Sequence, residues 1–207
     1  MEKLYIFNFP EMWRVFRVQH PAFWMVCGYL AVEYFRPQAI LPFIDFLPWG
    51  QCFLIAGLLL KWGDKSAVKF SSVPLSLLLV YLVIILISGS TSYFPEWAKG
   101  RYLLYWQWII VFYLLDTIVS TKERFYLILM LFCLASFKLS LFGAKTWALR
   151  GFSFTKWGIV GPSGYFQNSG ELSIQMLVFV PVGYYMYVTF KDRCINKATK
   201  LLLMLFF

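Results

Sequence analysis

The polar residues best suited to bind a substrate lie together in one glycine-containing stretch of an otherwise apolar chain. Arg150 and Lys156 bring positive charge, and Gln167, Asn168 and Glu171 follow at the start of an apolar run. A guanidinium group suits phosphate oxygens because its planar fork donates two parallel hydrogen bonds. Exposed backbone amides at the start of a helix form a second kind of anion site. The stretch therefore indicates a lipid diphosphate as its ligand.

These residues also have a simpler structural interpretation. Asn168 or Ser169 could cap the helix that follows, and Glu171 suits the first turn of such a helix. Arg101, which starts another apolar run, belongs to the same candidate set, but a cation in that place could equally extend to lipid head groups. For most of these residues, the sequence does not decide between a structural role and ligand binding. For Arg150, which has glycines around it, phosphate binding is favoured over head-group contact.

Two further acidic residues are weaker candidates. Glu33 lies three residues before Arg36, and a local ion pair that ends a helix before Pro37 explains this arrangement, although the pair could also line a polar entrance. Asp116 falls within an apolar run, where a carboxylate is a functional candidate by default. Its closeness to Lys122 also permits a position at the membrane interface.

Other kinds of chemistry lack the residues that they need. The sequence has no metal-ligand cluster, no D-x-D pair, no nucleotide-binding glycine loop and no Ser/His/Asp set. Its four cysteines show no C-x-x-C spacing and are interpreted as structural thiols. We therefore expect neither a metal nor another cofactor. If a sugar is transferred, arginines rather than a metal should hold the leaving group.

The elements that must position these residues are membrane helices. Hydrophobic residues make up 60% of the chain and charged residues 14%, against about a quarter charged in an average soluble domain. A spanning helix needs roughly 20 apolar residues. The sequence predicts an all-α, polytopic transmembrane bundle with six full spans, at about 21–35, 48–60, 73–90, 102–120, 125–142 and 172–190. The tail from 198 to 207 looks like the start of a seventh span, so we expect the chain to be truncated there.

The distribution of basic residues predicts the orientation of the bundle. Twelve of the 19 Lys and Arg residues fall on the side of the N-terminal segment 1–20, which places that interfacial segment in the cytoplasm. The transmembrane domain then covers 21–207, and its loop at about 143–171 faces outward. The single histidine, His20, faces inward. The net charge of +9 follows this membrane-loop pattern and does not by itself indicate nucleic acid.

Two stretches resemble the N-terminal half of the bacterial O-antigen ligase/polymerase superfamily. One, residues 32–51, reads VEYFRPQAILPFIDFLPWGQ and resembles the opening helices of a subgroup. The other, residues 149–176, reads LRGFSFTKWGIVGPSGYFQNSGELSIQM and is similar to a family pattern of arginine, glycine, an aromatic residue and a short Asn-containing turn. The family turn often reads N-P-N, and Gln167-Asn168-Ser169-Gly170-Glu171 departs from it.

The resemblance implies a metal-independent glycosyltransferase of the bacterial inner membrane that takes part in lipopolysaccharide or polysaccharide biosynthesis. Such an enzyme moves a glycan, with inversion, from undecaprenyl diphosphate to a hydroxyl acceptor at the periplasmic face; the acceptor is a lipid A core, a growing polysaccharide or a protein. Arg150 matches the first diphosphate-binding arginine. The family's histidine base would lie beyond Phe207, so the catalytic residue is not among the residues of this chain.

Two other functions remain open from the sequence. A transporter (flippase) for a lipid-linked or polysaccharide intermediate would place ionisable residues near mid-span. This chain puts most of its charges at helix ends, which favours an enzyme with a surface site. A non-catalytic membrane partner of a glycan assembly complex is the third possibility. Membrane lipids are partners in every case, and nucleic acid is expected in none.

Overall fold

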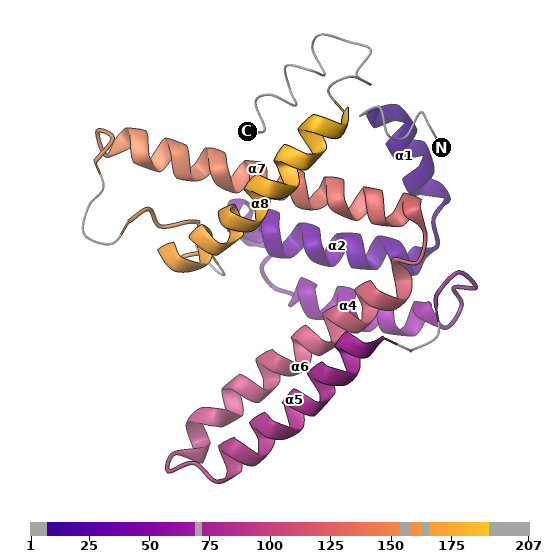
Figure 1. The fold of residues 1–207 in the computed structure, drawn as a ribbon, viewed down its shortest axis with the longest axis vertical. Helices are drawn as coiled ribbons and strands as arrows, with labels where there is room; N and C mark the ends of the chain where they lie inside the picture. The colour runs from indigo at the N-terminus through magenta and orange to yellow at the C-terminus, as the bar shows by residue number, and fades with distance from the viewer. Residues whose placement is uncertain (1–7, 69–71, 154–157, 163–165, 191–207) are drawn as a thin grey trace.

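The structure is a computed structural model that describes residues 8–68, 72–153, 158–162 and 166–190. Every regular element in these residues is a helix, which confirms the all-α class (Figure 1). The elements are α1 (Phe9–Val18), α2 (Pro21–Phe35), α3 (Pro37–Ile40), the 3₁₀ turn η2 (Pro42–Ile44), α4 (Trp49–Lys61), α5 (Val73–Ser90), α6 (Pro95–Ile118), α7 (Lys122–Leu149) and α8 (Ser169–Phe190).

Local sequence signals set where the helices begin and end. The side chain of Ser72 accepts a bond from the Leu75 amide at the start of α5, and the side chain of Thr121 caps α7 in the same way. At the start of α2, His20 Nδ1 accepts a bond from the Ala22 amide. Helix α2 ends where Arg36 takes a left-handed conformation, with φ of 47°. Pro37 follows, and a residue before proline avoids the helical region.

Within the residues that the structure describes, three helices are long and apolar enough to cross a membrane: α5, α7 and α8. This supports a membrane protein, but it is fewer than the six spans that the sequence predicts. Helices α2 and α4 have 15 and 13 residues, which at 1.5 Å per residue give about 22 and 20 Å against a hydrocarbon thickness of about 30 Å. Helix α6 is long enough, but it carries Glu96 and Arg101 near one end and Asp116 near the other.

The expected outward loop is shorter than predicted. Helix α7 continues to Leu149 and α8 begins at Ser169, so the connection covers 150–168 rather than about 143–171. The N-terminal segment contains the amphipathic helix α1, which exposes Phe9 and Trp13 and buries Met12. The expected start of a seventh span, 198–207, lies outside the described residues.

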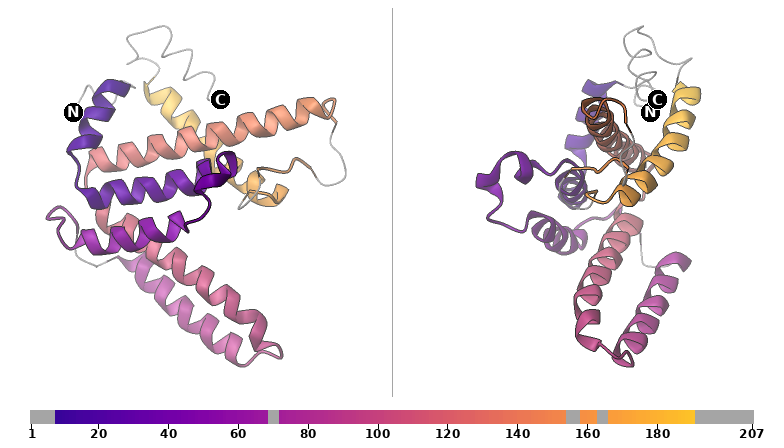
Figure 2. Two further views of the ribbon diagram at one scale, coloured as in Figure 1. Left: turned by 180° about the vertical axis from the view of Figure 1, so that it is seen from behind. Right: turned by 90° about the vertical axis from the view of Figure 1, so that its left-hand side faces the viewer.

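The helices form one layered group and one projecting hairpin. Helix α2 packs on α4 and on α7, and α8 crosses α7 (Figure 1). Helices α5 and α6 pack against each other and project away from this group, as both views in Figure 2 confirm. Phe23, Leu114, Ile118 and Met130 are almost fully buried where α2, α6 and α7 meet.

The helix α5 behaves as a lipid-facing helix. Although all but a few of its residues are apolar, it buries few of them inside the protein, and side chains such as Leu77, Val80 and Ile84 are more than half exposed. Apolar surface of this extent is costly in water and is accommodated by lipid. Its contact with α6 depends on Gly89, where a Cβ atom would overlap the hydroxyl group of Tyr102.

Candidate functional site

Arg150 lies directly after α7, and its side chain bonds to a residue further along the chain. Its Nη1 donates a 2.9 Å hydrogen bond to the carbonyl oxygen of Gly158, eight residues later. The chain reverses here because Gly151, Phe152 and Gly158 adopt positive φ angles of 64°, 58° and 72°. Glycine adopts such angles without strain. The Arg150 side chain is exposed, so this bond to Gly158 lies at the protein surface.

The start of α8 confirms that Asn168 acts as a cap. Its Oδ1 accepts a 2.9 Å bond from the Gly170 amide, and its carbonyl oxygen accepts the first helical bond, from the Leu172 amide at 3.2 Å. Gln167 is exposed beside it. Glu171 lies in the first turn, where a negative charge is favourable. The turn that the sequence suggested for binding therefore also has a defined structural role.

A cavity of about 630 Å³ lies between the end of α7, the loop and the start of α8, and we call it the α7–α8 cavity. Ser140, Ser169 and Ser173 line it, together with Gly158, whose carbonyl is held by Arg150. Hydroxyl groups and the amino end of a helix suit an anionic or hydroxyl-bearing ligand. Arg150 thus fixes one wall of the cavity.

Glu171 belongs to a different cavity on the other side of α8. This α2–α6–α8 cavity has a volume of about 540 Å³. Glu33 and Tyr29 from α2, Trp108 from α6, and Glu171 and Gln175 from α8 are among its lining residues. The two cavities share the first two turns of α8. Of the predicted site residues that the structure describes, Glu171 alone lines one of these cavities; Arg150 bonds to Gly158 and Asn168 precedes Ser169, which are lining residues of the α7–α8 cavity.

Arg101, a predicted site residue on α6, lies apart from both cavities. Arg101 is exposed near the start of α6, at the projecting end of the α5–α6 hairpin, and lines neither cavity. This end of the hairpin lies away from the end of α7 in every view (Figures 1 and 2). Lys156 lies outside the described residues. Among the described residues, no three His, Cys, Asp or Glu side chains lie together as a metal site would require.

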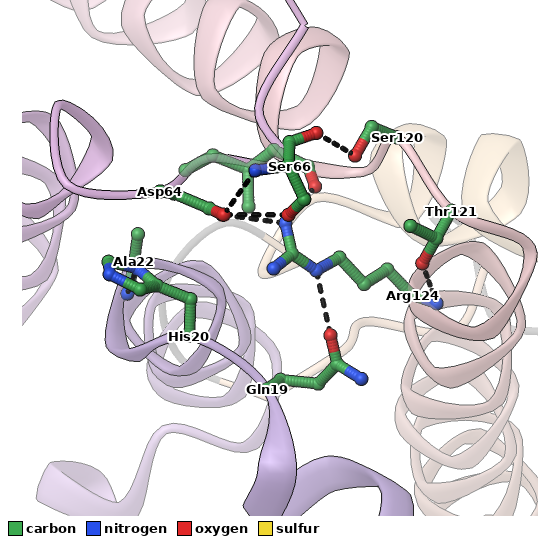
Figure 3. Close-up of polar contacts among 9 residues, drawn as sticks. Gln19, His20, Ala22, Asp64, Ser66, Ser120, Thr121 and Arg124 are labelled. Atoms are coloured by element: carbon green, nitrogen blue, oxygen red, sulfur yellow. Dashed lines mark hydrogen bonds and ion pairs between the residues drawn. The ribbon is translucent and has the colours of Figure 1, made fainter.

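The most elaborate polar site was not predicted from the sequence. The guanidinium group of Arg124 donates to Asp64 Oδ2 at 2.7 Å and to Gln19 Oε1 at 2.8 Å (Figure 3). It also donates to the Ile118 carbonyl oxygen at 2.8 Å. Arg124 is 3% exposed and Asp64 7% exposed. We call this network the hub. From the sequence, Arg124 is one of the twelve basic residues assigned to the side of the N-terminal segment, whereas the structure buries it in an ion pair.

The hub joins three connections that are distant in the chain. Gln19 lies between α1 and α2, Asp64 between α4 and α5, and Arg124 begins α7 just after the α6–α7 connection. Further bonds reinforce it: the Ser66 hydroxyl and amide both donate to Asp64, and the Ser120 hydroxyl donates to the Ser66 carbonyl. Such a network fixes the relative positions of the helix ends.

The electrostatics of the hub keep Asp64 ionised. Burial acts to raise the pKa of Asp64, but hydrogen bonds from Arg124 and Ser66, with the positive charge of Arg124, outweigh it and hold the pKa below its ordinary value. A low-pKa carboxylate that is already paired is a poor general base at neutral pH. The hub is therefore structural in character rather than catalytic.

No family model, no curated protein and no solved structure matches this chain.

Proposed function

We propose that the protein is a glycosyltransferase of the O-antigen ligase/polymerase type in the bacterial inner membrane. It transfers a glycan from undecaprenyl diphosphate to a hydroxyl acceptor at the periplasmic face, without a metal. The observation that carries the proposal is the arrangement around α8: its capped amino end contacts two separate cavities, and Arg150 fixes a wall of one of them. A transferase needs a place for a donor and a place for an acceptor, and these cavities supply two places side by side.

The α7–α8 cavity is the proposed donor site. Arg150 lies at its edge, and a guanidinium group has five N–H donors, so loop ordering through Gly158 is compatible with phosphate binding. The amide groups at the start of α8 favour negative charge in the same region. Gln167 and Asn168 flank this helix start and are proposed to contact the head group, while Lys156 and Arg101 are proposed as more distant phosphate contacts.

The proposed membrane topology has six spans with the N-terminus in the cytoplasm. The hub supports the alternation on which this topology depends, because its three connections are those that alternation assigns to one compartment. The connections at the opposite helix ends lie away from the hub (Figure 1). In this arrangement α2, α4 and α6 cross with the help of flanking residues or of local bilayer thinning, and the loop 150–168 faces the periplasm.

The decisive test replaces Arg150 in the protein produced from its whole gene. Arg150→Ala should abolish glycan transfer while the protein level in the membrane stays unchanged, and Arg150→Lys should restore only part of the activity because an ammonium group lacks the fork. Arg17→Ala, which removes another exposed arginine far from the cavity, is the matched control. Normal surface glycan in cells carrying Arg150→Ala would refute the proposal.

The same experiment separates transfer from transport. In a cell with a transport defect, the lipid-linked glycan accumulates at the cytoplasmic face, whereas a transferase defect leaves it at the periplasmic face. Periplasmic accumulation in the Arg150→Ala cells supports the transferase. Cytoplasmic accumulation would support the flippase alternative, and no accumulation with lost surface glycan would support a non-catalytic partner.

A further inference from the structure

We infer that the α2–α6–α8 cavity is a saccharide site that binds the hydroxyl groups of the sugar acceptor through Glu33, Glu171 and Gln175. Only the assignment of the bound sugar as the acceptor rests on the proposed function. The binding of a sugar here follows from the cavity itself. Its volume of about 540 Å³ lies within the range of about 300–1,000 Å³ that is usual for small-molecule sites.

Helical spacing brings the polar groups of the cavity together. Tyr29 and Glu33 are four residues apart on α2, and Glu171 and Gln175 are four residues apart on α8. Residues at this spacing lie on the same face of a helix, one turn apart. Each helix therefore presents a pair of hydrogen-bonding side chains to the cavity between them.

Glu33 is held in place by the start of α4. A Cβ atom on Gly50 would lie 2.7 Å from Glu33 Oε1, so the carboxylate lies directly against the backbone of the first turn of α4. No side chain of the N-cap residue, Pro48, bonds to this helix start. A carboxyl group at the amino end of a helix is favourably oriented with respect to the helix dipole.

Gln175 is oriented by a buried partner. Its Nε2 donates a 2.8 Å hydrogen bond to Ser136 Oγ on α7, and Ser136 is fully buried. With the amide nitrogen engaged there, the carbonyl oxygen is the group of Gln175 that remains to accept a bond in the cavity. Glu33, Glu171 and Gln175 thus all contribute hydrogen-bond acceptors.

The chemistry of this lining matches a sugar better than an anion. No Lys or Arg is found among the described residues that line the cavity, so it lacks the cations that a phosphate needs. A saccharide offers many O–H donors, which carboxylates accept in strong, charge-assisted bonds. It also offers apolar C–H faces, which pack on aromatic rings such as those of Trp108 and Tyr29. Two carboxylates with aromatic walls also fit an organic cation, so the experiment compares sugar binding with cation binding.

The test measures binding of simple probes to the purified protein in nanodiscs by saturation-transfer NMR. A panel of methyl hexopyranosides serves as sugar probes, and tetramethylammonium serves as the cation probe. We expect at least one glycoside to bind, and Glu171→Gln and Glu33→Gln each to weaken it by about tenfold, the loss expected for a charge-assisted hydrogen bond. Glu96→Gln, at an exposed glutamate outside the cavity, should leave binding unchanged. Binding of tetramethylammonium alone, or of no probe, would overturn the inference.

A second variant guards against misfolding. Gly50→Ala keeps every charge but its methyl group would push the Glu33 carboxylate aside, so it should weaken glycoside binding while the thermal unfolding temperature changes little. Glycoside binding unaffected by Gly50→Ala and by both glutamine variants would place the sugar elsewhere and refute the site. Arg150→Ala should not change glycoside binding. If Arg150→Ala leaves transfer intact while Glu171→Gln removes sugar binding, the proposed function fails and the saccharide site stands.

Discussion

Asp64 and Arg124 form a 2.7 Å ion pair although 60 residues separate them in the chain, and both side chains are almost fully buried. The pair is surrounded by further hydrogen bonds, so neither charge is left uncompensated in the interior (Figure 3). Removing one partner of such a pair lowers the stability of the protein strongly, because the remaining charge stays buried without its partner.

Replacing Asp64 should therefore destabilise the protein strongly. Asp64→Asn leaves the guanidinium group of Arg124 buried and unbalanced, and we expect a loss of about 3–5 kcal/mol in the free energy of unfolding. Thermal unfolding in detergent, followed by circular dichroism, measures the effect. Arg14→Ala is the matched control, since its pair with Glu11 leaves Arg14 73% exposed and should be worth only about 0–1 kcal/mol. An Asp64→Asn variant as stable as Arg14→Ala would show that the hub contributes little.

The hub also predicts a pH dependence. The pKa of Asp64 is lowered in the folded protein, so the carboxylate contributes stability that is fully present above the unfolded pKa of about 3.9 and is lost as the pH falls through the folded pKa. The stability difference between wild type and Asp64→Asn should be constant from about pH 5 to 7 and should shrink below about pH 4. A difference that shrinks between pH 7 and 5 would mean that the pKa of Asp64 is raised instead.

The contact between α5 and α6 should be sensitive to one methyl group. A Cβ on Gly89 would lie 1.6 Å from the Tyr102 hydroxyl oxygen, so Gly89→Ala forces the tyrosine aside and should cost about 1–3 kcal/mol, the usual cost of overpacking. Tyr102→Ala in the same chain removes the overlap, so the loss in the double variant should be smaller than the sum of the two single losses. Simple additivity would show that the two residues do not meet.

The proposed topology can be tested with a membrane-impermeant maleimide. Ser153→Cys, in the loop 150–168, should be labelled from the periplasm, and Lys65→Cys, beside the hub, should be labelled only after the cytoplasm is opened. Both residues are exposed, so failure to label is not explained by burial. Cys52 and Cys194 are first replaced by serine. Labelling of both positions from the same side would contradict the alternation of spans.

The helices were largely predictable from the sequence. Predicted runs 21–35 and 73–90 coincide with α2 and α5, because Pro21 and the capping Ser72 mark the two starts and Pro37 closely follows the end of α2. Helix α7 extends beyond the predicted 125–142 at both ends, and at its carboxyl end the buried Gly143 continues the helix instead of ending it. Lys138 lies inside the predicted run, and its Nζ donates to the Phe35 carbonyl at the end of α2. A charge inside a helix does not signal an end when tertiary structure supplies its partner.

The sites were only partly predictable. The cap at Asn168 follows from local spacing, which a sequence displays directly. The ion pair of Asp64 and Arg124 does not, because its partners come from distant connections and no local pattern marks them. Glu33 was considered only with its near neighbour Arg36, whereas the structure places it in a cavity with Glu171, 138 positions later. Long-range proximity is the information that the sequence lacked.

The hub gives the molecule one stiff end. Helix α7 runs about 42 Å from this anchored end to the loop that holds Arg150. A helix that is fixed at one end moves most at the other. A slight tilt of α7 at Asp64 therefore displaces the far end of α7, beside the two cavities, by a larger distance. Any opening and closing that accompanies ligand exchange should therefore be sought where α7 ends and α8 begins, while the buried ion pair stays in place.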